Sequence, residues 1–533
     1  MNFRKFFSSK GFLTGAALLA FAGVFSRLIG VIFRVPLTNI VGNFGMGLYQ
    51  MVFPLYSLLL IISSAGIPVA ISKMVASENV KGDIRACRRI LVNAVFLLGF
   101  IGLAVSAVFI GCAYPIASLQ GNKDVGIIYI AIAPSVFLVC IIAAFRGYFQ
   151  GLQNMVPTAA SQIIEQVAKV AAGVTLAVVF IKVSVVWAVF GAILAVTISE
   201  VVALLFLVGI YLFSLGKKTK AVRNISREKI KRYLDFKLMW SILKQSFPIT
   251  LMASVFPLLL VFDSMVVINM LTAAGVTHKT ATQLFGISSG SVHTLINLPA
   301  VIGVAIATAI VPMVSGLLKQ NKVEELRDKM ALAVKITVLI SMFFLVCYFV
   351  FAEKIIDLLY HGAFKDNSEH LKTAGRLMKI ESTMILFMSV SAVFTAMMQG
   401  AGKSKFPLIA LAIGGAAKIG FELAFLKTSL GIYSVSIGNV ICFAIAAALN
   451  AAFALRYVKI KKGLTIVVLK CAGLAAALFV LTRILDYVLP DNRWWVLLSG
   501  SAAFLFYVIF AYVLRLFDKF QKKSFNEEPV GNK

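Results

Sequence analysis

Long apolar stretches constrain the fold of this chain more than any other feature of its sequence. A transmembrane helix needs about 20 apolar residues, and roughly fourteen stretches of that kind follow one another between short polar connections. Hydrophobic residues make up 60% of the 533 residues and charged residues 14%, whereas soluble domains have about 45–50% and 25%. The sequence therefore predicts an all-α membrane protein with about fourteen transmembrane helices.

The 51 Lys and Arg residues are concentrated in the two terminal tails and in every second loop. This is the positive-inside pattern, in which the basic loops face the cytoplasm. We therefore expect a multi-pass protein of the bacterial cytoplasmic membrane with both termini in the cytoplasm. The same distribution accounts for the formal charge of +29 without a nucleic-acid partner.

The two sides of the longest basic loop, 214–245, resemble each other. Nineteen residues separate Gln150 from Lys169 on one side, and nineteen separate Gln399 from Lys418 on the other. Six spans repeated in the same orientation form a parallel repeat, whose halves face each other across a central cavity. The expected parts are an N-lobe at 1–213, a basic cytoplasmic linker at 214–245, a C-lobe at 246–462, and two extra helices with a cytoplasmic tail at 463–533.

Two arginines on the first predicted span, 12–41, are the main candidates for substrate binding, because a charge inside the membrane is costly. Arg27 and Arg34 lie seven positions apart and share a helical face with Gly23 and Gly30. Guanidinium groups match phosphate, and the glycines leave room for a bulky anion, so this face is predicted to bind a pyrophosphate. In the alternative interpretation, Arg34 reaches the membrane surface and Arg27 pairs with an acid on a neighbouring helix.

Two further pairs of charges have i, i+4 spacing inside predicted spans. Glu165 and Lys169 form one pair on span five, and Lys418 and Glu422 form the other on span eleven. Each pair can neutralise itself on one helix face, which favours a structural or gating role. Coupling to the substrate or to an ion is the alternative role for these four residues.

Glu200 on span six and Asp263 on span seven have no local partner in the sequence. They are candidates for pairing with Arg27 or for a proton or sodium site. The sequence contains no motif for hydrolysis or nucleotide binding, and its six cysteines lack metal-site spacing. We therefore expect no catalytic residues, no metal site and no cofactor, and we leave open coupling to an ion or to the membrane potential.

Four runs of sequence resemble one known family. They are SRLIGVIFRVPLTNIVG, GMGLYQMVFPLYSLLLIISSAGIPVAISKMVA, FRGYFQGLQNMVPTAASQIIEQ and PAVIGVAIATAIVPMVS. Together they are similar to the polysaccharide-transporter branch of the multidrug/oligosaccharidyl-lipid/polysaccharide exporter superfamily, in particular to the stage V sporulation protein B group, which is related to the MurJ lipid II flippases. The resemblance implies two six-helix lobes, a cationic cavity that holds a pyrophosphate, and a groove for a polyprenyl tail formed with the two extra helices.

The resemblance also implies that Arg27 matches one family arginine and that Arg34 matches a second after a one-residue shift. MurJ-like chains carry an acid and an arginine where this chain has His293 and Thr294, and an acid near Gly47, where this chain has none. These differences argue against lipid II itself as the substrate, whereas a related undecaprenyl-linked saccharide still fits.

The expected function is therefore a flippase that moves an undecaprenyl-pyrophosphate-linked saccharide, a precursor of cell wall, spore cortex or polysaccharide, from the inner to the outer leaflet. Its expected partners are the polyprenyl-linked saccharide and the bilayer, with cell-wall synthesis enzymes as further candidate partners. One alternative is a cation-coupled multidrug exporter of the same superfamily, although two arginines on span one disfavour a cationic substrate. The other is a membrane partner of cell-wall or sporulation enzymes that transports nothing.

Overall fold

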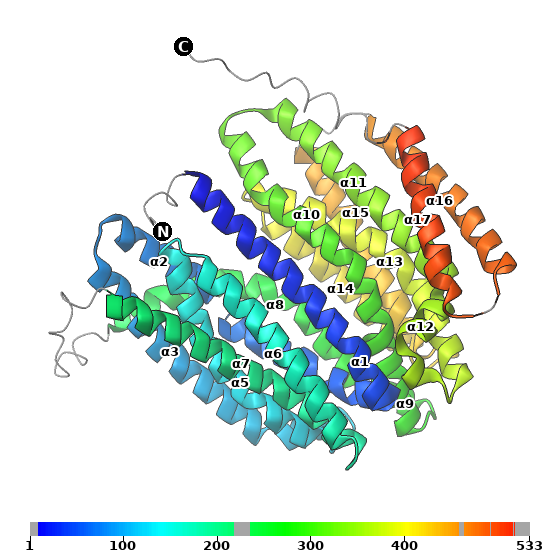
Figure 1. Ribbon diagram of the computed structural model, residues 1–533, viewed down its shortest axis with the longest axis horizontal. Helices are drawn as coiled ribbons and strands as arrows, with labels where there is room; N and C mark the ends of the chain where they lie inside the picture. The colour runs from blue at the N-terminus through cyan, green and yellow to red at the C-terminus, as the bar shows by residue number, and fades with distance from the viewer. Residues whose placement is uncertain are drawn as a thin grey trace. The chain divides into compact units, whose positions relative to one another are not determined.

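The computed structural model describes residues 9–64, 66–217, 235–457, 463–490, 492–514 and 516. Every regular element in these ranges is helical (Figure 1). The first nine helices and one π-helix are α1 (Ser9–Ser64), α2 (Ile67–Val80), α3 (Ile84–Gly111), α4 (Ala113–Leu119), α5 (Val125–Gly151), α6 (Val156–Phe180), α7 (Val185–Lys217), α8 (Phe236–Ala273), α9 (His278–Phe285) and η3 (Gly286–Val292). The others are α10 (His293–Lys319), α11 (Val323–Val350), α12 (Ala352–Phe364), α13 (Ser368–Gly400), α14 (Lys405–Phe425), α15 (Tyr433–Tyr457), α16 (Gly463–Val488) and α17 (Trp495–Val513).

Thirteen helical segments of the described chain are long and apolar enough to cross a membrane. The first of them, Phe21–Val80, is 60 residues long, about three times what one crossing needs. It contains the second predicted span, 46–72, and the first, 12–41, from residue 21 onward, with a break at Gly42, where φ is 68° and ψ is −178°. Only glycine adopts this backbone conformation readily, so Gly42 allows the chain to change direction between the two spans. The prediction of an all-α membrane protein with about fourteen spans is confirmed.

The contacts divide the chain into two compact units, of which the first contains residues 1–291 and 423–435. Within it, α5 packs against α2, α3 and α7, and α6 packs against α1 and α7. Apolar side chains from α2, α3, α5, α7 and α8 form its buried core. Asp235 caps the N-terminus of α8 by accepting hydrogen bonds from the backbone N–H groups of Lys237 and Leu238 at 2.9 and 3.2 Å. Its carboxylate also pairs with Arg89 of α3 at 3.1 Å, which fixes the start of α8 on α3.

The second unit contains residues 292–422 and 436–533. In it, α13 packs against α10, α11 and α12, and α16 and α17 pack against α11 (Figure 1). The hydroxyl of Tyr507 on α17 donates a hydrogen bond to the carbonyl of Leu339 on α11, at 2.8 Å. The two helices expected outside the six-span repeat are therefore fixed to α11 by apolar packing and by this bond.

The compact units have different boundaries from the predicted lobes, because α8 and α9 belong to the first unit. Both helices pack against α1. At Gly47 the α1 backbone lies directly against the carbonyl of Thr282 on α9, with no space for a side chain. The lobes at 1–213 and 246–462, the linker at 214–245 and the tail segment 463–533 remain predictions; residues 218–234 and 517–533 lie outside the described chain.

Candidate functional site

Helices α1 and α6 approach each other closely where the sequence places the candidate arginines (Figure 1). A Cβ atom on Gly30 of α1 would lie 3.6 Å from Oε1 of Gln166 on α6. One turn further along α1, the buried ring of Phe33 lies against Gly173 of α6, where a Cβ atom would be only 2.8 Å from the ring. Glycines on both helices thus bring the α1 face that carries Arg34 next to the α6 face that carries Gln166.

Arg34 is partly buried in the first unit, and its guanidinium lies over two aromatic rings of the second half of α1. Its Cζ atom is 6.0 Å from the ring centroid of Tyr49 and 5.4 Å from that of Phe53. Such cation–π contacts help to hold a guanidinium in place. Arg27 lies in α1 as predicted, but its side chain is outside the described part of the structure.

Glu165 of α6 forms its ion pair with Arg146 of α5. The Nη2 atom of Arg146 lies 2.8 Å from Oε2 of Glu165, and its Nε donates to Ser161 at 3.1 Å. The other carboxylate oxygen of Glu165 accepts a hydrogen bond from Gln166 at 2.8 Å. The i, i+4 spacing indicated Lys169 as the partner of Glu165, whereas the antiparallel packing of α5 and α6 supplies an arginine with better geometry.

Lys169 and Glu200 complete a cluster of charges on α1, α5, α6 and α7, which we call the cationic cluster: Arg34, Arg146, Glu165, Lys169 and Glu200. Lys169 interacts electrostatically with both carboxylates and with Arg34. Glu200 is 4% exposed, and its Oε2 accepts no hydrogen bond from any described residue. Three basic groups accompany two carboxylates, so the cluster carries a net positive charge when all five groups are ionised.

Asp263, the other acid without a local partner in the sequence, is buried in α8 of the first unit. It is not among the groups that interact with Lys169 or Glu200 in the described structure. The absence of an acid near Gly47 also has a structural reason, since the contact with Thr282 excludes any side chain at that position. The described residues hold no group of three or more side chains that could bind a metal.

In the second unit, Lys418 and Glu422 form the ion pair that their spacing predicted. Their side chains are 2% and 0% exposed, and Nζ lies 3.6 Å from Oε1. The pair packs against α15 at Gly438, where a Cβ atom would be 3.1 Å from Oε1 of Glu422. This arrangement is compatible with the structural or gating role expected from the sequence. The alternative role, coupling to the substrate or to an ion, stays a prediction.

Two intramembrane charges were missed by the sequence reasoning. Arg146 lies only four residues before the end of predicted span four, where an arginine is easily interpreted as reaching the membrane surface. Glu381 is fully buried in α13, near His293 of α10. Applying the rule that every charge within a predicted span is a functional candidate would have found both residues.

Comparison with known proteins supports this interpretation of the fold. Residues 12–318 match the family described as polysaccharide biosynthesis protein, and residues 257–423 match the MatE family. Stage V sporulation protein B of Bacillus subtilis (strain 168) is 28% identical over 95% of this chain and 96% of its own length. Lipid II flippase MurJ of the same organism is 23% identical over 79% of this chain and 78% of its own length.

Among solved structures, the lipid II flippase MurJ in an inward closed conformation has a TM-score of 0.68 and 16% identity, and the match covers 93% of this chain and 98% of that one. This similarity shows that the folds are alike. The activities named among the matches are flipping and multidrug transport rather than catalysis. They agree with the expectation that the chain is not an enzyme.

Proposed function

Because this chain belongs to the polysaccharide biosynthesis protein family of the multidrug/oligosaccharidyl-lipid/polysaccharide exporter superfamily, we propose that it is a flippase for a polyprenyl-linked saccharide. Its substrate is a saccharide on undecaprenyl pyrophosphate, which it moves from the inner to the outer leaflet of the bacterial cytoplasmic membrane by alternating access. Both termini face the cytoplasm in this proposal, as the basic loops indicate.

The net positive charge of the cationic cluster is the observation that carries the proposal. Arg34, Arg146 and Lys169 lie within the membrane-spanning part of the first unit, where unbalanced positive charge is costly. A pyrophosphate supplies the missing negative charge and accepts several charge-assisted hydrogen bonds. The same charge makes the site unfavourable for the lipophilic cations that a multidrug exporter would carry.

Arg34 and Lys169 are the groups we assign to the pyrophosphate, and Arg27 is a further candidate on the same face of α1. Arg146 positions Glu165 and contributes charge, since two of its N–H groups already have partners. With the cytoplasm negative, the potential assists outward movement of the anionic headgroup by about 2.3 kcal/mol per charge per 100 mV. No nucleotide is required for this step.

Flipping of an undecaprenyl-pyrophosphate-linked saccharide by purified protein in liposomes tests the proposal. Loss of one charge-assisted hydrogen bond costs about 1.5–3 kcal/mol, so Arg34→Ala should lower the apparent affinity roughly tenfold to a hundredfold. Arg34→Lys should restore it only in part, because lysine lacks the planar fork.

Lys403→Ala is the matched control. Lys403 also lies over an aromatic ring, with its Nζ atom 4.1 Å from the centroid of Tyr457 on α15, but it is not part of the cationic cluster. This control variant should flip substrate as the unmodified protein does. Normal flipping by a folded Arg34→Ala, Lys169→Ala double variant would refute the assignment of the site.

A further inference from the structure

Glu381 of α13 is a completely buried carboxylate within the second unit, in a segment apolar and long enough to span the membrane. Its Oε1 accepts a hydrogen bond from the hydroxyl of Ser436 at 2.8 Å and a longer one from Asn439 at 3.5 Å. Its Oε2 has no hydrogen-bond partner among the described residues. One oxygen of this carboxylate is thus held by α15, and the other is left for a different partner.

The imidazole of His293, at the start of α10, lies beside that second oxygen. Its Nδ1 lies 3.4 Å from Oε2 of Glu381, and this nitrogen also has no hydrogen-bond partner in the described chain. A buried acceptor and a buried ring nitrogen without partners are each costly. A hydrogen on either atom would give both a partner at once. The Nδ1–H tautomer of neutral imidazole already carries one, so it is the net negative charge of the buried pair that favours binding a further proton.

Other charged side chains on α13 and on nearby helices of the second unit are paired elsewhere or exposed. On α14, Lys418 is paired with Glu422, and that pair lies against α15. On α13 itself, Lys379 is 3.9 Å from Glu353 of α12, and Arg376 is exposed.

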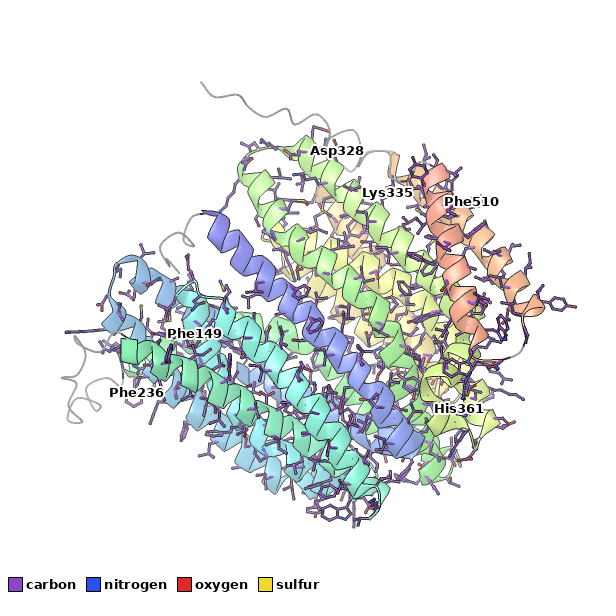
Figure 2. All side chains as sticks on the ribbon, viewed as in Figure 1. Phe149, Phe236, Asp328, Lys335, His361 and Phe510 are labelled. Atoms are coloured by element: carbon purple, nitrogen blue, oxygen red, sulfur yellow. The ribbon has the colours of Figure 1, made fainter. Side chains whose placement is uncertain are left out.

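Two further ion pairs involve α12. His361 pairs with Asp357 at 2.7 Å, and Lys354 pairs with Asp486 of α16 at 2.8 Å. On α11, Lys335, which Figure 2 labels, interacts electrostatically with Cys471 of α16. His293 is therefore the group placed to balance Glu381.

We propose that His293 and Glu381 form a site that binds one proton within the second unit and couples proton binding to transport. Without the proton, the site carries one net negative charge in the membrane, which costs several kcal/mol. With it, the pair is neutral overall, either as imidazolium and carboxylate or as imidazole and carboxylic acid. His293 is 14% exposed and Glu381 is not exposed, so the proton reaches the carboxylate through the imidazole. The coupling part of this proposal rests on the flippase function proposed above.

A sodium ion fits the same place less well. Alkali and alkaline-earth ions prefer shells of oxygen ligands, whereas imidazole nitrogen suits transition metals. The polar side-chain atom that the structure places beside the second oxygen of Glu381 is a ring nitrogen, at 3.4 Å. The chemistry of the pair therefore selects a proton.

Histidine titration by nuclear magnetic resonance tests the site without transport. The chain has 4 histidines, so protein labelled with ¹⁵N-histidine in detergent gives few signals, and His293→Gln identifies the one of interest. We expect Glu381→Gln to move the pH midpoint of His293 by about one unit or more, a tenfold change in proton affinity. Glutamine keeps the size of glutamate and an acceptor for Ser436, and a thermal melt verifies that the variant is folded.

Asp357→Asn is the matched control, because it removes the carboxylate from the more exposed pair with His361 on α12 (Figure 2). It should move the His361 midpoint and leave that of His293 unchanged. An unchanged His293 midpoint in Glu381→Gln would overturn the proposal. So would a response of the His293 signal to replacing KCl with NaCl at constant pH, because that result assigns the site to sodium. If Glu381→Gln fails to fold, Ser436→Ala serves in its place, with the same readout and a smaller expected shift.

The transport arm compares flipping with and without a pH gradient across the liposome membrane. The unmodified protein should respond to the gradient, and Glu381→Gln should lose that response. If the His293 midpoint responds to Glu381→Gln but the protein flips no saccharide, the flippase function is refuted and the proton site is retained. If the protein flips saccharide but the His293 midpoint does not respond, the proton site is refuted and the flippase function is retained.

Discussion

Replacing Glu165 with Gln breaks the ion pair with Arg146 in the first unit and should destabilise the folded protein measurably. The two side chains are 14% and 17% exposed and 2.8 Å apart, so solvent screens the pair weakly. Breaking a buried pair costs about 3–5 kcal/mol when one charge is left unpaired. Arg146 keeps its hydrogen bond to Ser161 in this variant, so we expect a loss of about 3 kcal/mol for Glu165→Gln, at the lower end of that range.

The reverse variant, Arg146→Gln, should cost less, about 1–2 kcal/mol, because the Glu165 carboxylate keeps its hydrogen bond from Gln166 and the charge of Lys169 near it. The double variant leaves no charge stranded. It should therefore be more stable than the sum of the two single changes predicts, with a coupling energy of about 1–3 kcal/mol. Reversible unfolding of the detergent-solubilised protein in a denaturant series gives the four free energies required.

The pair of Lys329 and Glu325 on α11 is the control for this cycle. The distance between Nζ of Lys329 and Oε1 of Glu325 is similar, 2.7 Å, but the two side chains are 46% and 35% exposed. Exposed pairs of this kind contribute about 0.3–0.5 kcal/mol. A coupling energy for Arg146 and Glu165 no larger than that of the control pair would refute the argument that their partner choice stabilises the first unit.

Three further changes have defined outcomes. Gly42→Ala should destabilise the fold by about 1–3 kcal/mol in the same unfolding series, because alanine is strained at this positive φ, and an unchanged stability would contradict the break in α1. Lys418→Met should cost about 3–5 kcal/mol and Lys418→Met with Glu422→Leu much less, since only the single change leaves a buried charge; equal losses would exclude a mutual pair. Cysteines introduced at Thr219 and Asn526, both outside the described residues, should resist an impermeant thiol reagent added to intact cells, and labelling there would show that the predicted topology is wrong.

Much of the fold was predictable because the membrane imposes local requirements. Each span must be apolar over its own length and must satisfy its own backbone hydrogen bonds, so its presence is encoded in about 20 consecutive residues. The pair of Lys418 and Glu422 is similarly local, since one helical turn brings the two side chains together. The family was also recognisable from continuous runs of sequence, above all the one that contains Arg146.

The sequence by itself therefore determined the helices, their approximate ends and the residues that carry charge into the membrane. Only the tertiary structure decided which of those charges meet. Glu165 pairs with Arg146 although Lys169 is one turn away, because the antiparallel packing of α5 and α6 aligns the guanidinium with the carboxylate. Glu381 faces His293 because α10 packs against α13, although the two residues are far apart in the chain. Partner choice depends on distances between helices, and the apolar pattern that defines each helix contains no information about them.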